Sequence, residues 1–227
     1  MDKLRILDEF AEKIREIWQD AMEVQARAED EVLERAKQKY IEAGEPEDMH
    51  YMDYYEPPED VWQEEIEKGL KKIAEIEEGE VDYESTVIVN YKGVRIGIVF
   101  DSPTSDDDGH TFVGYTLGLV VPKISMPENT DVIAIDFEKN IALCFTEEET
   151  HIGDSVGYSI PEVNVDLALR IVQESEDYII AMPLKSFEVH GEEAVRMEGM
   201  MGLYLIYSEY KLIGSISIDH KVLSLLS

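Results

Sequence analysis

The chain of 227 residues carries 51 acidic against 20 basic residues, which gives a formal net charge of −31 at pH 7. Its hydrophobic fraction of 44% and aromatic fraction of 9% are typical of globular proteins, so the composition excludes a disordered acidic tail. The abundance of Glu and Ile and the scarcity of Asn and Gln resemble thermophile proteins more than salt-adapted ones.

The composition also indicates where the protein is located and which partners it can have. The uncharged stretch 111–122 is shorter than the roughly 20 apolar residues that a membrane helix needs, so we expect no membrane partner. The N-terminal residues are charged where a signal peptide is apolar, and Cys144 is the only cysteine, so we expect a reducing, cytoplasmic location. The acidic excess repels phosphate backbones, which argues against direct nucleic-acid binding.

Two helices are predicted at the N-terminal end. Apolar residues recur every three or four positions through the first 43 residues, and Gly44 and Pro46 end this pattern. A second helix is predicted over residues 59–78, where Trp62 begins an apolar stripe. We expect the two to form a helical hairpin within residues 1–83. The alternative is a coil along the first helix that holds together a homodimer or another homo-oligomer.

From residue 84 onward the hydrophobic period becomes that of β-strands. Segments 86–89 and 94–100 flank Asn90–Gly93, which predicts a hairpin with a positive φ at Gly93. A short amphipathic helix is predicted over 165–174, and a final strand or short helix is predicted at the C-terminus. Further strands are expected at 111–121, 132–137, 141–146, 178–182, 186–190, 203–207 and 212–218.

These patterns predict an α+β fold class. An N-terminal helical hairpin, residues 1–83, packs on or precedes residues 84–227, which form a mainly antiparallel sheet with one short helix. The two parts can also pack as a single domain. Both are acidic, so the charge belongs to the folded surface and not to a detachable tail.

Segment 45–60, between the predicted helices, is the most unusual in the chain. It is rich in Asp, Glu, Tyr and Met and contains no Lys or Arg. Carboxylates can meet basic side chains while tyrosine rings stack on guanidinium groups, so the segment suits docking on a basic protein surface. The alternative is a solvated connection whose tyrosines cover the helical core. The predicted contact residues are Asp48, Asp53, Tyr54, Tyr55, Glu56, Glu59 and Asp60.

The loop from Asp101 to His110 is the candidate metal site, with Asp106, Asp108 and His110 as ligands. Its spacing does not match an EF-hand, because Tyr115 stands where a bidentate Glu is required. A polar loop with turn residues is the simpler interpretation. No cofactor-binding or catalytic motif is present, and an apolar strand surrounds Cys144, which favours a core role over a catalytic one.

The function predicted from these features is a non-enzymatic, acidic protein-binding module. It engages a basic protein surface, such as that of a nucleic-acid-binding protein, and acts as a nucleic-acid mimic or inhibitor of the kind that viruses use. A self-associating structural protein is the alternative. A metal-dependent hydrolase, in which the loop from Asp101 to His110 holds the ion, is the further alternative.

Overall fold

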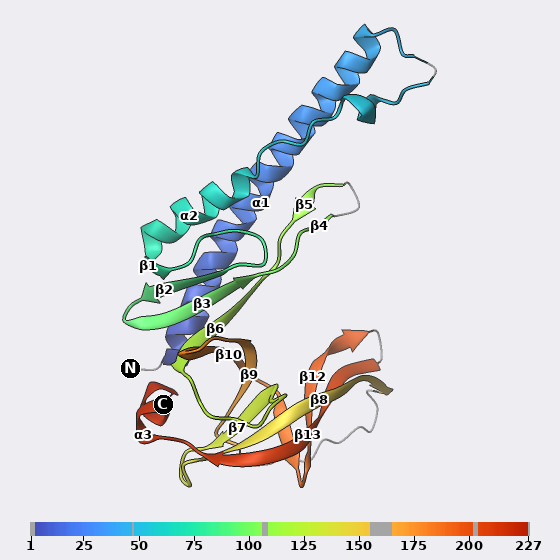
Figure 1. The fold of residues 1–227 in the computed structure, drawn as a ribbon. Helices are drawn as coiled ribbons and strands as arrows, with labels where there is room; N and C mark the ends of the chain where they lie inside the picture. The colour runs from blue at the N-terminus through green and yellow to red at the C-terminus, as the bar shows by residue number, and fades with distance from the viewer. Residues whose placement is uncertain (1–2, 47, 106–108, 155–164, 202–203, 227) are drawn as a thin grey trace. The chain divides into compact units, whose positions relative to one another are not determined.

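The computed structural model describes residues 3–46, 48–105, 109–154, 165–201 and 204–226 (Figure 1). The chain divides into two compact units, an N-terminal unit of residues 8–116 and a C-terminal unit of residues 1–7 and 117–227. Helices precede a large antiparallel sheet, which confirms the predicted α+β class. Among the described residues no helix is long and apolar enough to cross a membrane. The predicted division into residues 1–83 and 84–227, which can also pack as a single domain, stays a prediction.

The N-terminal unit contains the predicted pair of helices, the first of them from residue 8 onward. Helix α1 spans Lys3–Glu42, α2 spans Val61–Ile73, and a short 3₁₀ helix, η1, spans Tyr51–Tyr54. The helices approach closely, because a Cβ atom added at Gly69 would lie 2.4 Å from the Cγ2 atom of Ile17. Burial on α1 is concentrated before residue 30, and in residues 30–42 only Ala36 is buried. The buried apolar residues of the pair in this unit are Phe10, Ile14, Ala21, Ala36, Trp62, Ile66 and Leu70.

Helix α2 ends earlier than the predicted limit at residue 78. The backbone of Ala74 is extended, with φ of −144°, and strand β1, Glu75–Glu78, follows it. Strand β1 pairs antiparallel with β2, Thr86–Tyr91. The Nε atom of Arg95 on the next strand lies 2.7 Å from the Oε2 atom of Glu77. Sheet pairing and this contact therefore override the helical tendency of the glutamates.

The predicted hairpin is confirmed. Strand β2 pairs with β3, Val94–Phe100, across a turn in which Lys92 has φ of +53° and Gly93 has φ of +80°. Two consecutive residues with positive φ match the tight turn that suits the twist of antiparallel strands. The side chains of Val87, Ile88 and Val89 are all buried, so β2 is covered on both of its faces.

The predicted strand 111–121 is interrupted. Strand β5, Thr111–Phe112, forms a small hairpin with β4, Thr104–Ser105, and β6 begins only at Tyr115 and runs to Pro122. The intervening carbonyl oxygen of Val113 accepts a hydrogen bond of 2.6 Å from the indole Nε1 of Trp18. Because the carbonyl group of Val113 bonds to α1, it does not take part in strand pairing.

The C-terminal unit consists of antiparallel strands in the order β6-β10-β9-β7-β8-β13-β12-β11. Its buried cluster includes Val132, Phe145, Val189, Ala194 and Tyr210. A short helix, α3, His220–Leu226, ends the described chain and is the short helix left open at the C-terminus. The strands not yet bounded are β7, Val132–Asp136, β8, Ile141–Asp154, β9, Leu167–Glu174, β10, Tyr178–Leu184, β11, Phe187–His190, β12, Glu193–Met201, and β13, Tyr204–Ser217.

The predicted helix over 165–174 is wrong, because these residues form strand β9 between β7 and β10. Leu167, Ala168 and Leu169 are all buried, as expected of a central strand covered on both faces. Such a strand lacks the alternation that separates a strand from a helix. Strand β12 was not predicted, and the two predicted segments 203–207 and 212–218 lie largely in one strand, β13.

Candidate functional site

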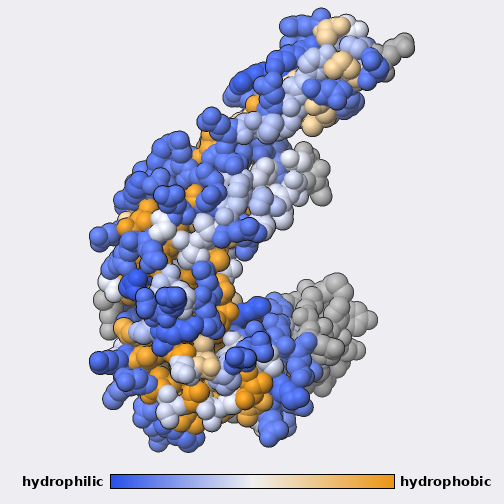
Figure 2. All heavy atoms as spheres, viewed as in Figure 1, coloured by the Kyte–Doolittle hydropathy of each residue, from blue (hydrophilic) through white to orange (hydrophobic). Residues whose placement is uncertain are grey.

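The predicted contact segment lies partly at the end of the helical hairpin. Helix α1 stops before Gly44, whose φ is +83°, and the chain turns back through η1. Three apolar side chains in this region are exposed, with exposed fractions of 54% for Ile41, 39% for Met49 and 46% for Met52. Figure 2 shows pale apolar side chains among hydrophilic ones here. We define the tip surface as Ile41, Asp48, Met49, Met52, Asp53 and Glu56.

Local contacts hold the tip in shape. The ring of Tyr54 packs on Tyr40 of α1 with 6.3 Å between ring centroids, and its hydroxyl donates to the Sδ atom of Met49 at 3.7 Å. The backbone N–H of His50 donates to the Oδ2 atom of Asp53 at 2.6 Å, which caps η1. Tyr54 and Asp53 therefore shape the surface as well as belonging to the predicted site.

The acidic groups of the tip remain largely accessible. Asp48 and Glu56 are both exposed, and Glu56 approaches Lys39 at only 3.9 Å, with 86% of its side chain exposed. An exposed pair at this distance contributes little stability, so its carboxylate is available to a partner. The tip surface thus combines accessible negative charge with exposed methionine and isoleucine.

The structure does not bring all seven predicted residues together. The carboxylate of Asp60 accepts a 2.7 Å hydrogen bond from the hydroxyl of Tyr83, which in turn accepts from the indole N–H of Trp62 at 3.2 Å. Trp62 is also bonded to Gln25 on α1, whereas Tyr54 packs on Tyr40. Gln25 and Tyr40 are roughly 22 Å apart along the axis of α1, at 1.5 Å per residue. Asp60 is thus a structural residue away from the tip surface.

Tyr55 and Glu59 lie on the return path from the tip to α2. Burial raises the pKa of Tyr55, and the negative charge of Glu29 on α1 adds to this effect. Tyr55 is half-buried, as the alternative interpretation of the tyrosines would expect. Glu59 is exposed.

The Tyr83 hydroxyl predicts a stability change at high pH. Burial first, and then the hydrogen bond to Asp60, raise the pKa of Tyr83 to about 12. An unfolded tyrosine has a pKa near 10, so between about pH 10 and about pH 12 the unfolded chain loses a proton that the folded chain retains. The free energy of unfolding should fall as pH rises through this window, by on the order of 1 kcal/mol after solvent screening.

Urea unfolding of wild type and of Tyr83→Phe at about pH 9 and about pH 12 measures this effect. Below about pH 10 the contribution is fully present, so the variant shows only its loss of the hydrogen bonds to Asp60 and Trp62. The wild type should lose more stability than the variant over the window. An identical loss in both proteins would assign the pH dependence to another group.

The structure does not test the candidate metal ligands. Asp106 and Asp108 lie outside the described residues, and His110 contacts Asp30 of α1, with 3.1 Å between Nε2 and Oδ1. The described part of the chain contains no group of three or more His, Cys, Asp or Glu side chains placed to hold a metal ion. The metal site therefore stays an untested alternative to the simpler interpretation of a polar loop.

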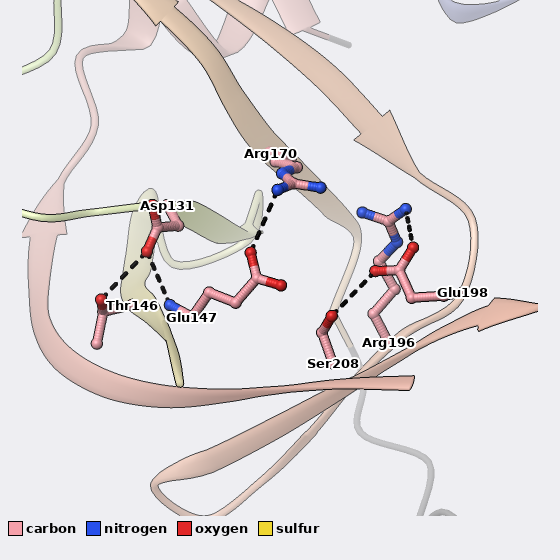
Figure 3. Close-up of polar contacts among 7 residues, drawn as sticks. All are labelled: Asp131, Thr146, Glu147, Arg170, Arg196, Glu198 and Ser208. Carbon is pink, nitrogen blue, oxygen red and sulfur yellow. Dashed lines mark hydrogen bonds and ion pairs between the residues drawn. The ribbon is translucent and has the colours of Figure 1, made fainter. Parts of the chain in front are cut away.

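A polar cluster in the C-terminal unit was missed by the sequence analysis (Figure 3). An Nη2 atom of Arg170 on β9 lies 3.2 Å from the Oε2 atom of Glu147 on β8. On β12, the corresponding atoms of Arg196 and Glu198 are 2.6 Å apart, and the hydroxyl of Ser208 donates to Glu198 at 3.2 Å. We define the paired-arginine cluster as Glu147, Arg170, Arg196, Glu198, Ser208 and Tyr210.

Tyr210 links this cluster to the core. Its side chain is 1% exposed, and its ring lies 5.4 Å from that of Phe187, centroid to centroid. Burial raises the pKa of Tyr210, and the charges of Glu147, Arg196 and Arg170 act on it as well. The Tyr210 hydroxyl and the Nη1 atom of Arg196 are buried without a hydrogen-bond partner among the described residues.

No local motif in the sequence marks this cluster. Arg170 lies in a segment predicted as a helix, and Arg196 lies in a strand that was not predicted, so the facing of neither side chain could be inferred. Only the strand order brings β8, β9, β12 and β13 into one unit. The cluster can therefore be recognised only from the tertiary arrangement of these strands.

Cys144 is fully buried on β8, and burial raises the pKa of its thiol. A raised pKa disfavours the reactive thiolate, which agrees with a core role. Comparison of the chain with protein-family models, with curated proteins and with solved structures finds no match in any of the three.

Proposed function

We propose that the protein is a non-enzymatic, cytoplasmic binding module whose tip surface engages a basic protein surface, such as the nucleic-acid-binding face of another protein. One observation carries this proposal: exposed Ile41, Met49 and Met52 lie among accessible carboxylates at the end of the helical hairpin. Apolar groups exposed together commonly mark interaction sites, and methionine adapts to varied partner shapes.

The two kinds of side chain have different roles. The carboxylates attract a basic partner over about 8 Å at physiological salt and accelerate the encounter, but exposed charges alone contribute little affinity. Burial of Ile41, Met49 and Met52 supplies the remaining affinity. Such a surface resembles nucleic acid in its negative charge and differs from it in its apolar contacts.

Charge complementarity favours a basic partner over a second copy of the chain. Two tip surfaces in contact would bring like charges together, which opposes self-association. In addition, two residues of α1 that a homodimer coil would use already pack inside the N-terminal unit. Ile14 is 1% exposed, and Trp18 packs on Phe112 with 4.8 Å between ring centroids.

Affinity capture from a cell lysate tests the proposal with three matched variants. The charge variant is Asp48→Asn with Glu56→Gln, and the apolar variant is Met49→Ser with Met52→Ser. The control variant is Glu12→Gln with Glu16→Gln, which removes equal charge from exposed positions of α1 outside the tip. Asp53 stays unchanged because it caps η1.

The wild type is expected to retain a single basic protein that elutes with rising salt and is displaced by added nucleic acid. The charge variant should release it at lower salt, and the apolar variant should bind it about tenfold more weakly, which corresponds to about 1.4 kcal/mol. The control variant should behave as wild type. Equal weakening in the control, or retention that does not respond to salt, would contradict the proposal.

A further inference from the structure

The paired-arginine cluster contains two buried hydrogen-bond donors whose acceptors are absent from the described residues. These are the Nη1 atom of Arg196 and the hydroxyl of Tyr210. Most buried polar groups in native proteins are hydrogen-bonded, so two such donors in one cluster require an explanation. Both are groups that proteins use to bind carboxylate oxygens.

Strand register places the two donors on the same face of the sheet. Tyr210 on β13 lies opposite Ala194 on β12, and Arg196 is two residues further along β12. Such diagonal neighbours have Cα atoms roughly 7–8 Å apart, within reach of long side chains. On the other side of β13, Tyr210 lies opposite Glu147. The charge of Arg196 also lowers the pKa of the Tyr210 hydroxyl, against the larger effect of burial, in keeping with this register.

The surrounding ion pairs hold the donors without using them. Glu198 contacts the Nη2 atom of Arg196, which leaves Nη1, the other arm of the guanidinium fork, unpaired among the described residues. Glu147 on β8 contacts Arg170 on β9 in the same way. The two pairs balance in formal charge, so these four groups add no net charge to the site.

The cluster lies between solvent and the apolar core. The side chain of Arg170 is 39% exposed and that of Arg196 is 17% exposed, so the cluster borders the solvent. Beneath them, the ring of Phe187 contacts those of both Tyr210 and Phe145, with centroids 5.4 Å and 5.5 Å apart. A ligand reaching the two donors would therefore place its apolar part near aromatic rings.

We propose that the paired-arginine cluster binds a small organic carboxylate. One carboxylate oxygen accepts from Arg196 Nη1 and the hydroxyl of Tyr210, and Arg196 keeps its contact with Glu198. A charged acceptor is favoured over a neutral carbonyl because hydrogen bonds between ionised partners are roughly twice as strong as neutral ones. This site belongs to the C-terminal unit and is independent of the tip surface.

The test uses sodium benzoate as the probe, with benzamide as its neutral counterpart and sodium chloride to match ionic strength. The full chain is labelled with ¹³C at the tyrosine Cζ atoms, and the spectrum of Tyr210→Phe assigns the resonance of Tyr210. Benzoate is expected to shift this resonance saturably at about 0.15 M salt, where long-range repulsion by the acidic protein is screened. Benzamide should bind more weakly, and chloride should leave the resonance unchanged.

Variants identify the groups responsible by calorimetric titration with benzoate. Tyr210→Phe and Arg196→Lys should each weaken benzoate binding by on the order of tenfold, because each removes a donor to a charged group. Tyr207→Phe is the matched control, since Tyr207 is three residues away on β13 and faces the other side of the sheet. Circular dichroism confirms that each variant folds. If Tyr210→Phe does not fold, benzoate binding by Arg196→Lys tests the proposal alone.

The proposal is overturned if benzoate produces no saturable shift, if benzamide or chloride reproduces it, or if the two cluster variants bind benzoate as tightly as Tyr207→Phe does. In those cases the two donors are satisfied by water or by another part of the chain. Stronger binding of benzamide than of benzoate would likewise overturn the choice of a carboxylate.

Discussion

Replacing Gln25 by leucine is expected to lower the free energy of unfolding by about 4 kcal/mol, although the residue is an uncharged amide on a helix. Gln25 is 1% exposed and connects three elements of the N-terminal unit. Its Oε1 atom accepts from the backbone N–H of Trp62 at 3.3 Å, and its Nε2 atom donates to Glu29 at 3.0 Å. Glu29, 7% exposed, also accepts from the N–H of Thr111 at 2.9 Å.

The size of this effect follows from what leucine leaves behind. An N–H at the start of α2 would lose its acceptor, and Asp60 at the N-cap position makes no side-chain cap bond to replace it. A buried carboxylate would lose a donor as well. Each unsatisfied buried group costs about 1–3 kcal/mol, and more when it is charged.

Gln38→Leu is the control for this prediction. Gln38 donates to Glu42 at 3.1 Å with the same spacing of four residues on the same helix, but both side chains are exposed. Its replacement should change stability by no more than about 0.5 kcal/mol. Equilibrium urea unfolding measures both. Equal effects of the two substitutions would show that burial of the Gln25–Glu29 contact does not matter.

Gly79→Ala is expected to destabilise the protein by at least about 3 kcal/mol, through strain and a steric clash together. Gly79 has φ of +86°, and a Cβ atom there would lie 2.0 Å from the carbonyl oxygen of Thr86. That oxygen belongs to the first residue of β2, so relief of the clash requires movement of the backbone.

Gly93→Ala separates the two causes. Gly93 has nearly the same φ, +80°, but a Cβ atom added there meets nothing within 4 Å. It should therefore cost only about 1 kcal/mol, the strain of a left-handed alanine. Thermal and urea unfolding of both variants measure the difference. If Gly93→Ala destabilised the protein as much as Gly79→Ala, the positive φ alone would explain the loss of stability, without the steric clash.

Local patterns in the sequence predict the elements that carry a helical apolar stripe or a clear turn signal. Helix α1 is confirmed because its apolar residues recur at helical spacing up to the glycine that ends it, Gly44. The β2–β3 hairpin is confirmed because its turn contains Gly93. In contrast, the sequence of β9 suits either state, and only its position between β7 and β10 makes it a strand.

The candidate sites divide in the same way. Exposed carboxylates such as Asp48 and Glu56 could be placed on a surface from composition alone. The structural use of Asp60 could not, because it depends on Tyr83, which is 23 residues away along the chain. Arg196 and Tyr210 meet only through strand register, which no local pattern specifies.

The uneven burial along α1 affects how a complex could be mapped. Because Ala36 is the only buried residue in 30–42, little apolar contact opposes opening of the last turns of the helix. Backbone amides there should exchange with deuterium through local opening, at free energies well below that of global unfolding, whereas amides near Phe10 and Ile14 exchange far more slowly. A bound partner would slow exchange in the final turns first, and so reveal the contact region without any substitution.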